Sequence, residues 1–108
     1  MSAAVTDGPA HQATADRLHE AIWSWRRRLI ADRIAELETL ELATERALSG
    51  HAGGNDIREA VLHLRELLSR AELMLQWEQP DYADMASERA ERELITLRGI
   101  ARQVGVLR

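Results

Sequence analysis

The feature that most constrains the fold is a stretch from Thr14 to Ser49 that contains neither glycine nor proline. Nothing in these residues breaks a helix. Thr14 is placed to cap a helix at its start, and Asp16 lies where a negative charge suits the positive end of the helix dipole. We therefore expect one long helix over 14–49, roughly 52 Å in length at about 1.5 Å per residue.

Two short segments divide the rest of the chain into two further helices. The first, SGHAGGND, holds three glycines, and Gly50 is placed to end the long helix. The second, EQPDY, holds Pro80, a residue that does not fit inside a helix, and Asp81 can cap the helix that follows. The breaks predict a second helix over 55–78 and a third over 82–104.

Both later helices carry apolar or small side chains at alternating spacings of four and three residues, which is typical of packed helices. These positions are Ile57, Val61, Leu64, Leu68, Ala71 and Leu75 in the second helix, and Ala83, Ser87, Ala90, Leu94, Leu97, Ala101 and Val104 in the third. Short turns imply antiparallel neighbours. The sequence predicts an all-α fold, a three-helix antiparallel bundle with a long first helix, as a single domain at 14–108. A flexible N-terminal arm of small and polar residues is expected at 1–13.

The helix lengths do not match, and this mismatch predicts association. Folded back from Gly50, the second helix would cover the long helix only to about residue 26, so that the preceding dozen residues overhang. Monomers rarely leave such an apolar surface in water. The second helix also has a second apolar face. We therefore expect a homodimer that forms a larger helical bundle. Its interface residues are expected to be Leu18, Ile22, Trp23, Trp25, Leu62, Leu73 and Trp77.

The segment IWSWRRRLIADR, residues 22–33, places charge within an apolar helix face. On a helical wheel Arg26 and Arg33 fall in the middle of that face, and His19 lies seven residues before Arg26. A buried guanidinium needs a partner. Three partners remain open: a carboxylate of another helix, such as Glu93 or a neighbouring chain's Glu36; water between subunits; or an anionic ligand bound by His19, Arg26 and Arg33.

Composition argues against several classes of function. The 108-residue chain has a formal net charge of −4, and acidic residues interleave with its 14 basic residues, so nucleic acid is not an expected partner. All the basic residues are arginine, which fits a GC-rich bacterial genome. No apolar run is long enough for a membrane span, and no signal peptide is evident, so we expect a cytoplasmic protein. Cysteine is absent, and no metal or cofactor site is expected.

One short motif suggests chemistry. REAVLH, from Arg58 to His63, has an Arg-x4-His spacing that resembles the motif of HEPN-type ribonucleases, small helical bundles that dimerise to form their site. The resemblance implies RNA cleavage by Arg58 and His63. No nucleophile beside a base and no phosphate-binding loop is found. The sequence thus predicts a homo-oligomeric protein-interaction or regulatory module without catalytic chemistry. The alternative is a dimeric helical enzyme or sensor that binds an anionic ligand or cleaves RNA.

Overall fold

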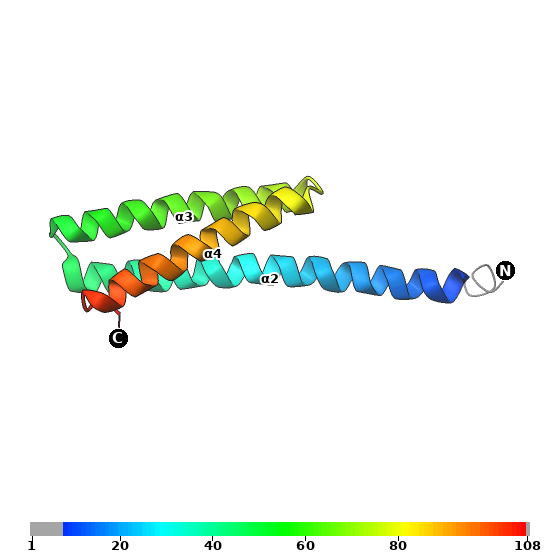
Figure 1. Cartoon of the computed structure of the whole chain (residues 1–108), viewed down its shortest axis with the longest axis horizontal. Helices are drawn as coiled ribbons and strands as arrows, with labels where there is room; N and C mark the ends of the chain where they lie inside the picture. Colours follow the sequence, from blue (N-terminus) through cyan, green and yellow to red (C-terminus); the bar gives the residue numbers. More distant parts are fainter. Residues whose placement is uncertain (1–7, 108) are drawn as a thin grey trace.

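The computed structural model describes residues 8–107, apart from the side chain of residue 52, and this part of the chain folds into three helices (Figure 1). Helix α2 spans Gly8–Leu48, α3 spans Ala52–Gln76 and α4 spans Pro80–Gln103. Helix α3 runs back along α2, and α4 runs back along α3 (Figure 1). No strand occurs between residues 8 and 107. The predicted all-α, three-helix antiparallel fold is confirmed.

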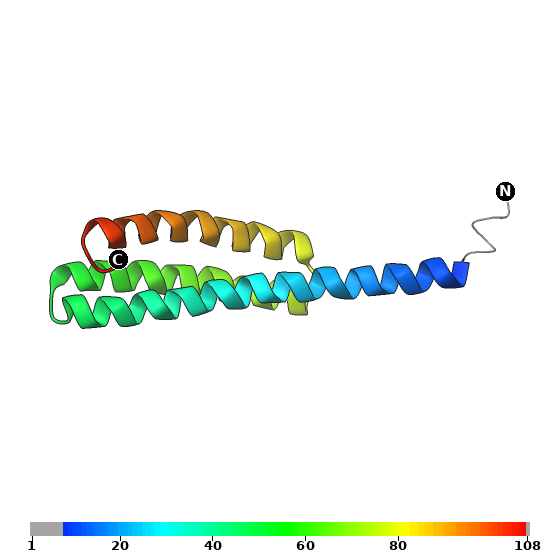
Figure 2. The same ribbon diagram turned by 90° about the horizontal axis from the view of Figure 1, so that it is seen from below.

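The molecule is elongated because α2 continues well beyond the other two helices (Figures 1 and 2). Its extents are 70 × 26 × 17 Å and its radius of gyration is 19.5 Å, against about 13 Å for a compact domain of 100 residues. Residues 9–22 are all exposed, and Trp23 is the first residue after them that is partly buried. We call residues 8–22 the overhang.

The core lies where the three helices run together, and it uses the predicted seams. Every predicted seam residue of α3 is buried, and so is every predicted seam residue of α4 up to Ala101. Val104 is exposed because α4 ends at Gln103. Helix α2 contributes Ile30, Leu37 and Leu40 from its apolar face. The bundle covers only part of that face, because its other members are at most partly buried: Ile22, Trp23, Trp25, Leu29 and Ile34.

Helix α3 is the central element of the bundle. Both α2 and α4 pack closely against it, whereas α2 and α4 approach each other over a much smaller area. Side chains that connect α2 with α4 must therefore be long. Arginine meets this requirement, and Arg26, Arg33 and Arg98 each reach from one of these helices to an acid of the other.

The long helix begins earlier than expected. Its first residue is Gly8 instead of Thr14, and the Thr14 hydroxyl donates a hydrogen bond to the Ala10 carbonyl at 3.0 Å. Such a bond to the residue four positions earlier belongs to the interior of a helix, not to its cap. Of the arm expected at 1–13, residues 8–13 are therefore helical, and residues 1–7 lie outside the described part of the chain.

The two turns also differ in detail from the expected ones. Gly50 has the left-handed φ of +80° that ends α2, as its type suggests, but α3 then begins at Ala52, before the glycine pair. Helix α4 begins at Pro80 itself. A proline suits the first turn of a helix, because its missing N–H would have no helical partner there. The prediction used Pro80 only as a helix breaker, and it therefore placed the start of α4 two residues late.

Candidate interaction surface

Two ion pairs connect α2 with α4 and repeat with the period of the helices. The Arg26 guanidinium donates from Nε and Nη2 to the two carboxylate oxygens of Asp84, each at 3.0 Å. Arg33 Nε donates to Glu91 Oε2 at 2.9 Å. Each arginine lies 58 residues before its acid, so the spacing of seven on α2 matches a spacing of seven on α4. The two helices are parallel and in fixed register over this length.

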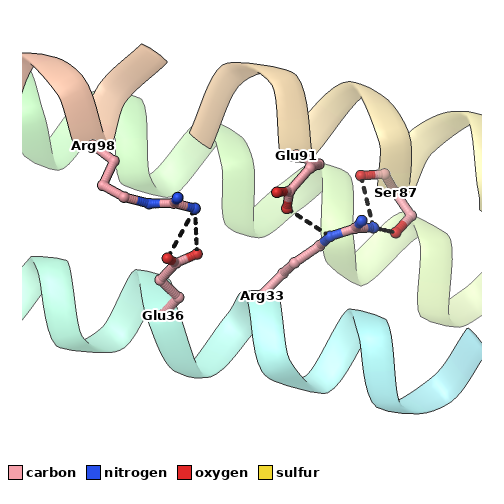
Figure 3. Close-up of polar contacts among 5 residues, drawn as sticks. All are labelled: Arg33, Glu36, Ser87, Glu91 and Arg98. Atoms are coloured by element: carbon pink, nitrogen blue, oxygen red, sulfur yellow. Dashed lines mark hydrogen bonds and ion pairs between the residues drawn. The ribbon is translucent and has the colours of Figure 1, made fainter. Parts of the chain in front are cut away.

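A third ion pair continues the series with its charges exchanged. Glu36 of α2 accepts from Arg98 Nη2 of α4 at 2.9 Å (Figure 3). Figure 3 also shows Arg33 between Glu91 and Ser87, where Nη1 donates to both the hydroxyl and the carbonyl oxygen of Ser87. The three pairs together hold three positive and three negative charges, so this side of the bundle is close to neutral.

Of the three possible partners for the arginines, the structure shows a carboxylate of another helix. The specific acids differ from those suggested by the sequence. Glu36 pairs within its own chain, and Glu93 lies 3.4 Å from His63 Nε2. Asp84 and Glu91 were missed as partners, although their spacing of seven, equal to that of the arginines, was a usable signal.

The polar row of His19, Arg26 and Arg33 does not converge on one point. His19 is exposed on the overhang, with its ring centroid 5.6 Å from that of Trp23. The Arg26 guanidinium lies 5.8 Å from the Trp23 ring centroid on its way to Asp84. Because both arginines already donate to carboxylates, an added anion would be repelled by the charges of Asp84 and Glu91. The geometry therefore favours structural ion pairs at these positions.

The motif REAVLH does not bring its two functional residues together. Arg58 Nη2 contacts Glu45 on α2 at 2.6 Å, whereas His63 faces Glu93 on α4. A separation of five residues rotates two side chains by roughly 140° around a helix. The arginine and the histidine thus serve different helix contacts, and nothing in this arrangement directs both at one phosphate.

The expected interface residues of α2 divide into two groups. Trp23 is half-buried and packs against the core, at the end of the bundle. Leu18 and Trp25 are 60% and 52% exposed, and Ile22 is also exposed. Leu18, Ile22 and Trp25 lie in one row along the helix, at spacings of four and three residues. This exposed row starts on the overhang and reaches the bundle at Trp25.

The expected interface residues of α3 form a separate surface. Leu62, Leu73 and Trp77 are exposed on the side of α3 opposite its buried seam. Glu59 and Glu66 are also exposed there, so charge interrupts this apolar face. The row on α2 and the face on α3 point in different directions and would engage different partners or different parts of one partner.

Other kinds of site find no support in the described residues. Among residues 8–107, no group of three histidine, aspartate or glutamate side chains is placed to bind a metal ion. None of the three helices has the length and apolar character needed to cross a membrane. Comparison with protein families, with curated proteins and with solved structures finds no match to this chain.

Proposed function

We propose that this chain is a protein-interaction module that acts by associating with a second copy of itself and carries no catalytic chemistry of its own. The observation that carries the proposal is the exposed row of Leu18, Ile22 and Trp25 on a helix that extends past the bundle. These apolar side chains contribute nothing to the three-helix core.

The physical cost of this row supports association. Full burial of a leucine, isoleucine or similar side chain is worth about 1.5–3 kcal/mol relative to exposure. The core does without the row, since none of Leu18, Ile22 and Trp25 belongs to it or packs against it. A second chain is the simplest source of cover, because a surface on a two-fold axis meets an identical surface.

The polar groups support the same proposal. Arg26 and Arg33, the two arginines within the apolar face of α2, are each matched by an acid of α4, so each guanidinium already has a partner within the chain. The pairing makes Arg26 and Arg33 supports for the position of α4. It does not give them the open geometry of an anion site.

The test measures molecular mass in solution by light scattering after gel filtration, over a series of protein concentrations. We expect wild type to be a dimer and Leu18→Glu to be a monomer with unchanged helix content. Leu62→Glu is a matched control, because Leu62 is 57% exposed and also lies on a helix surface. We expect it to remain a dimer.

Two results would contradict the proposal as stated. A monomeric wild type at all concentrations would exclude self-association. A dimer that survives Leu18→Glu but dissociates in Leu62→Glu would move the interface to the outer face of α3.

A further inference from the structure

A groove runs between α3 and α4 on the side of the bundle that faces away from α2. On α3, Arg65 reaches Glu41 of α2, and Leu67, two residues later, points roughly 160° away from Arg65. On α4, Asp84 reaches α2, and Ala86, two residues later, points away in the same manner. Leu67 and Ala86 line one cavity of about 490 Å³. This cavity therefore opens on a surface that α2 does not cover.

The groove has an apolar floor and an exposed apolar edge. Leu67 is buried, and Met74 and Ala86 are half-buried. Tyr82 and Met85, which line the same cavity, are 63% and 66% exposed. Large apolar side chains at the edge of an apolar hollow are typical of a surface that binds a partner.

The groove is long enough for a helix. A second cavity of about 380 Å³ lies between the same two helices and is lined by the apolar side chains of Ala60, Leu97 and Ile100. Arg92 lines both cavities, so the second continues the first. From Tyr82 to Ile100 the groove follows α4 for roughly 27 Å at 1.5 Å per residue. A further helix laid along two antiparallel helices in this way would complete a four-helix bundle.

The first cavity has an excess of positive charge. Arg70, Arg89 and Arg92 line it together with one acid, Glu88. Among the described residues, neither Arg70 nor Arg92 forms an ion pair, and Arg89 has only a 3.8 Å contact with Glu93, which lines the second cavity. Three arginines less one glutamate leave a net charge of +2 here, in a chain whose formal net charge is −4. The local charge favours an acidic partner.

The side chains of the first cavity are of the types that protein interfaces favour. Both methionines between residues 8 and 107 line it, as does the single tyrosine of the chain. Aromatic residues, methionine and arginine are enriched in protein interfaces, and the unbranched methionine side chain adapts to different apolar surfaces. We infer that the groove between α3 and α4 binds an acidic amphipathic helix of another protein. The apolar face of that helix covers Met74, Tyr82 and Met85, and its carboxylates pair with the arginines.

The overhang of a second copy does not have the charge pattern that the groove requires. The acids of the overhang are Asp16 and Glu20, and each is two residues from Leu18. Both therefore point roughly 160° away from Leu18. With Leu18 placed in the groove, both acids would point away from the arginines. The occupant of the groove is thus a different protein, and the inference does not depend on self-association.

Two designed peptides test the inference by fluorescence anisotropy with the full chain. Both are helical, about 18 residues long to match the groove, and carry leucines at alternating spacings of three and four. One has glutamates beside the leucines, and the other has lysines at the same positions. We expect the glutamate peptide to bind saturably, and the lysine peptide to bind about tenfold more weakly, because three exposed ion pairs together are worth about that factor. Absent binding of the glutamate peptide, or equal binding of both, would overturn the inference.

Variants locate the binding site. Arg89→Glu with Arg92→Glu should weaken binding of the glutamate peptide about tenfold. Arg17→Glu with Arg28→Glu is the matched control, because it changes two exposed arginines of α2 and alters the net charge equally, and it should leave binding unchanged. Met85→Ser should weaken binding by removing an apolar contact. Loss of binding in the control as large as in the Arg89 and Arg92 variant would overturn the inference, as would wild-type binding in that variant.

Two further measurements separate this inference from the proposed function. Circular dichroism shows whether each variant folds, and the comparison of the two peptides on wild type needs no variant. Light scattering of Arg89→Glu with Arg92→Glu should still show the expected dimer, because the groove lies apart from the exposed row of α2. A monomeric wild type that binds the glutamate peptide would sustain this inference and exclude self-association, whereas a dimer that binds neither peptide would do the opposite.

Discussion

At the scale of single residues, Arg33 joins three polar groups of α4 to α2. Its side chain is only 15% exposed, and it donates to Glu91 and to both oxygens of Ser87. Arg33→Ala would leave the Glu91 carboxylate and the Ser87 hydroxyl partly buried without this donor. We expect the free energy of unfolding to fall by about 2 kcal/mol, the usual size for a lost hydrogen bond to a charged group. Urea denaturation followed by circular dichroism measures this change.

Arg28→Ala is the matched control for that prediction. Arg28 lies on the same helix but is exposed, so its loss should change the free energy of unfolding by no more than about 0.5 kcal/mol. Adding Glu91→Ala to Arg33→Ala completes a double-mutant cycle. The double variant should lose less free energy of unfolding than the sum of the losses in the two single variants. Equal effects of Arg33→Ala and Arg28→Ala would show that the pair with Glu91 contributes nothing to stability.

For single residues, the sequence predicts that a buried arginine needs a partner but does not identify that partner. That Arg26 and Arg33 need partners follows from the wheel alone, because both fall within an apolar face. Their partners, Asp84 and Glu91, depend on the axial register between α2 and α4. That register is set by two turns and by the length of α3, and an error of a few residues in a helix boundary changes every pairing. Glu93 was suggested for this reason, although it faces α3.

At the scale of helices and turns, Glu78 adopts a backbone conformation that is more favourable for glycine. Its φ is +57°, in the left-handed region. The Glu78 N–H donates to the Leu75 carbonyl at 3.0 Å, and the Gln79 N–H donates to the Met74 carbonyl at 2.8 Å. This is the Schellman pattern, in which the left-handed residue is usually glycine. We expect Glu78→Gly to raise the free energy of unfolding by about 1 kcal/mol, because a side chain in that region is disfavoured.

Glu66→Gly tests whether the gain comes from the turn. Glu66 is exposed in the middle of α3, where a glycine should instead lower the free energy of unfolding by about 1 kcal/mol. Thermal melts of the two variants should therefore shift in opposite directions. A loss of stability in both would mean that the left-handed conformation of Glu78 is not strained.

The helices themselves were predictable because their seams are regular. Ile57 to Leu75 and Ala83 to Ala101 follow the four-three pattern closely enough to identify both buried faces. The helix ends were less predictable, since they depend on single residues with more than one use. Pro80 can end a helix or begin one, and Glu78 gives no sign in the sequence of a left-handed turn. Threonine is suited to cap a helix, but the Thr14 hydroxyl donates a hydrogen bond to a carbonyl inside the same helix.

At the scale of the whole molecule, the difference in helix length is the main architectural fact. Comparing the three predicted lengths was enough to anticipate that α2 would extend past the bundle, and the exposed residues 9–22 confirm it. A partner for the extension was not predictable in the same way, because the sequence of one chain contains the apolar row but does not identify a surface that would bind it. In a two-fold pair each row would meet an identical row, and measurements in solution test this association.

Hydrogen exchange provides such a measurement along the whole chain. A helical extension without tertiary contacts opens easily, because packing provides most of the stability of a helix. In a dilute, monomeric sample the amides of residues 9–22 should exchange rapidly, while those around Leu64 and Leu68 in the core of α3 exchange slowly. Raising the protein concentration should slow exchange in the overhang and leave the core peptide unchanged. Slowing at the outer face of α3 instead, around Leu62 and Leu73, would place the interface there and leave the overhang free for a different protein.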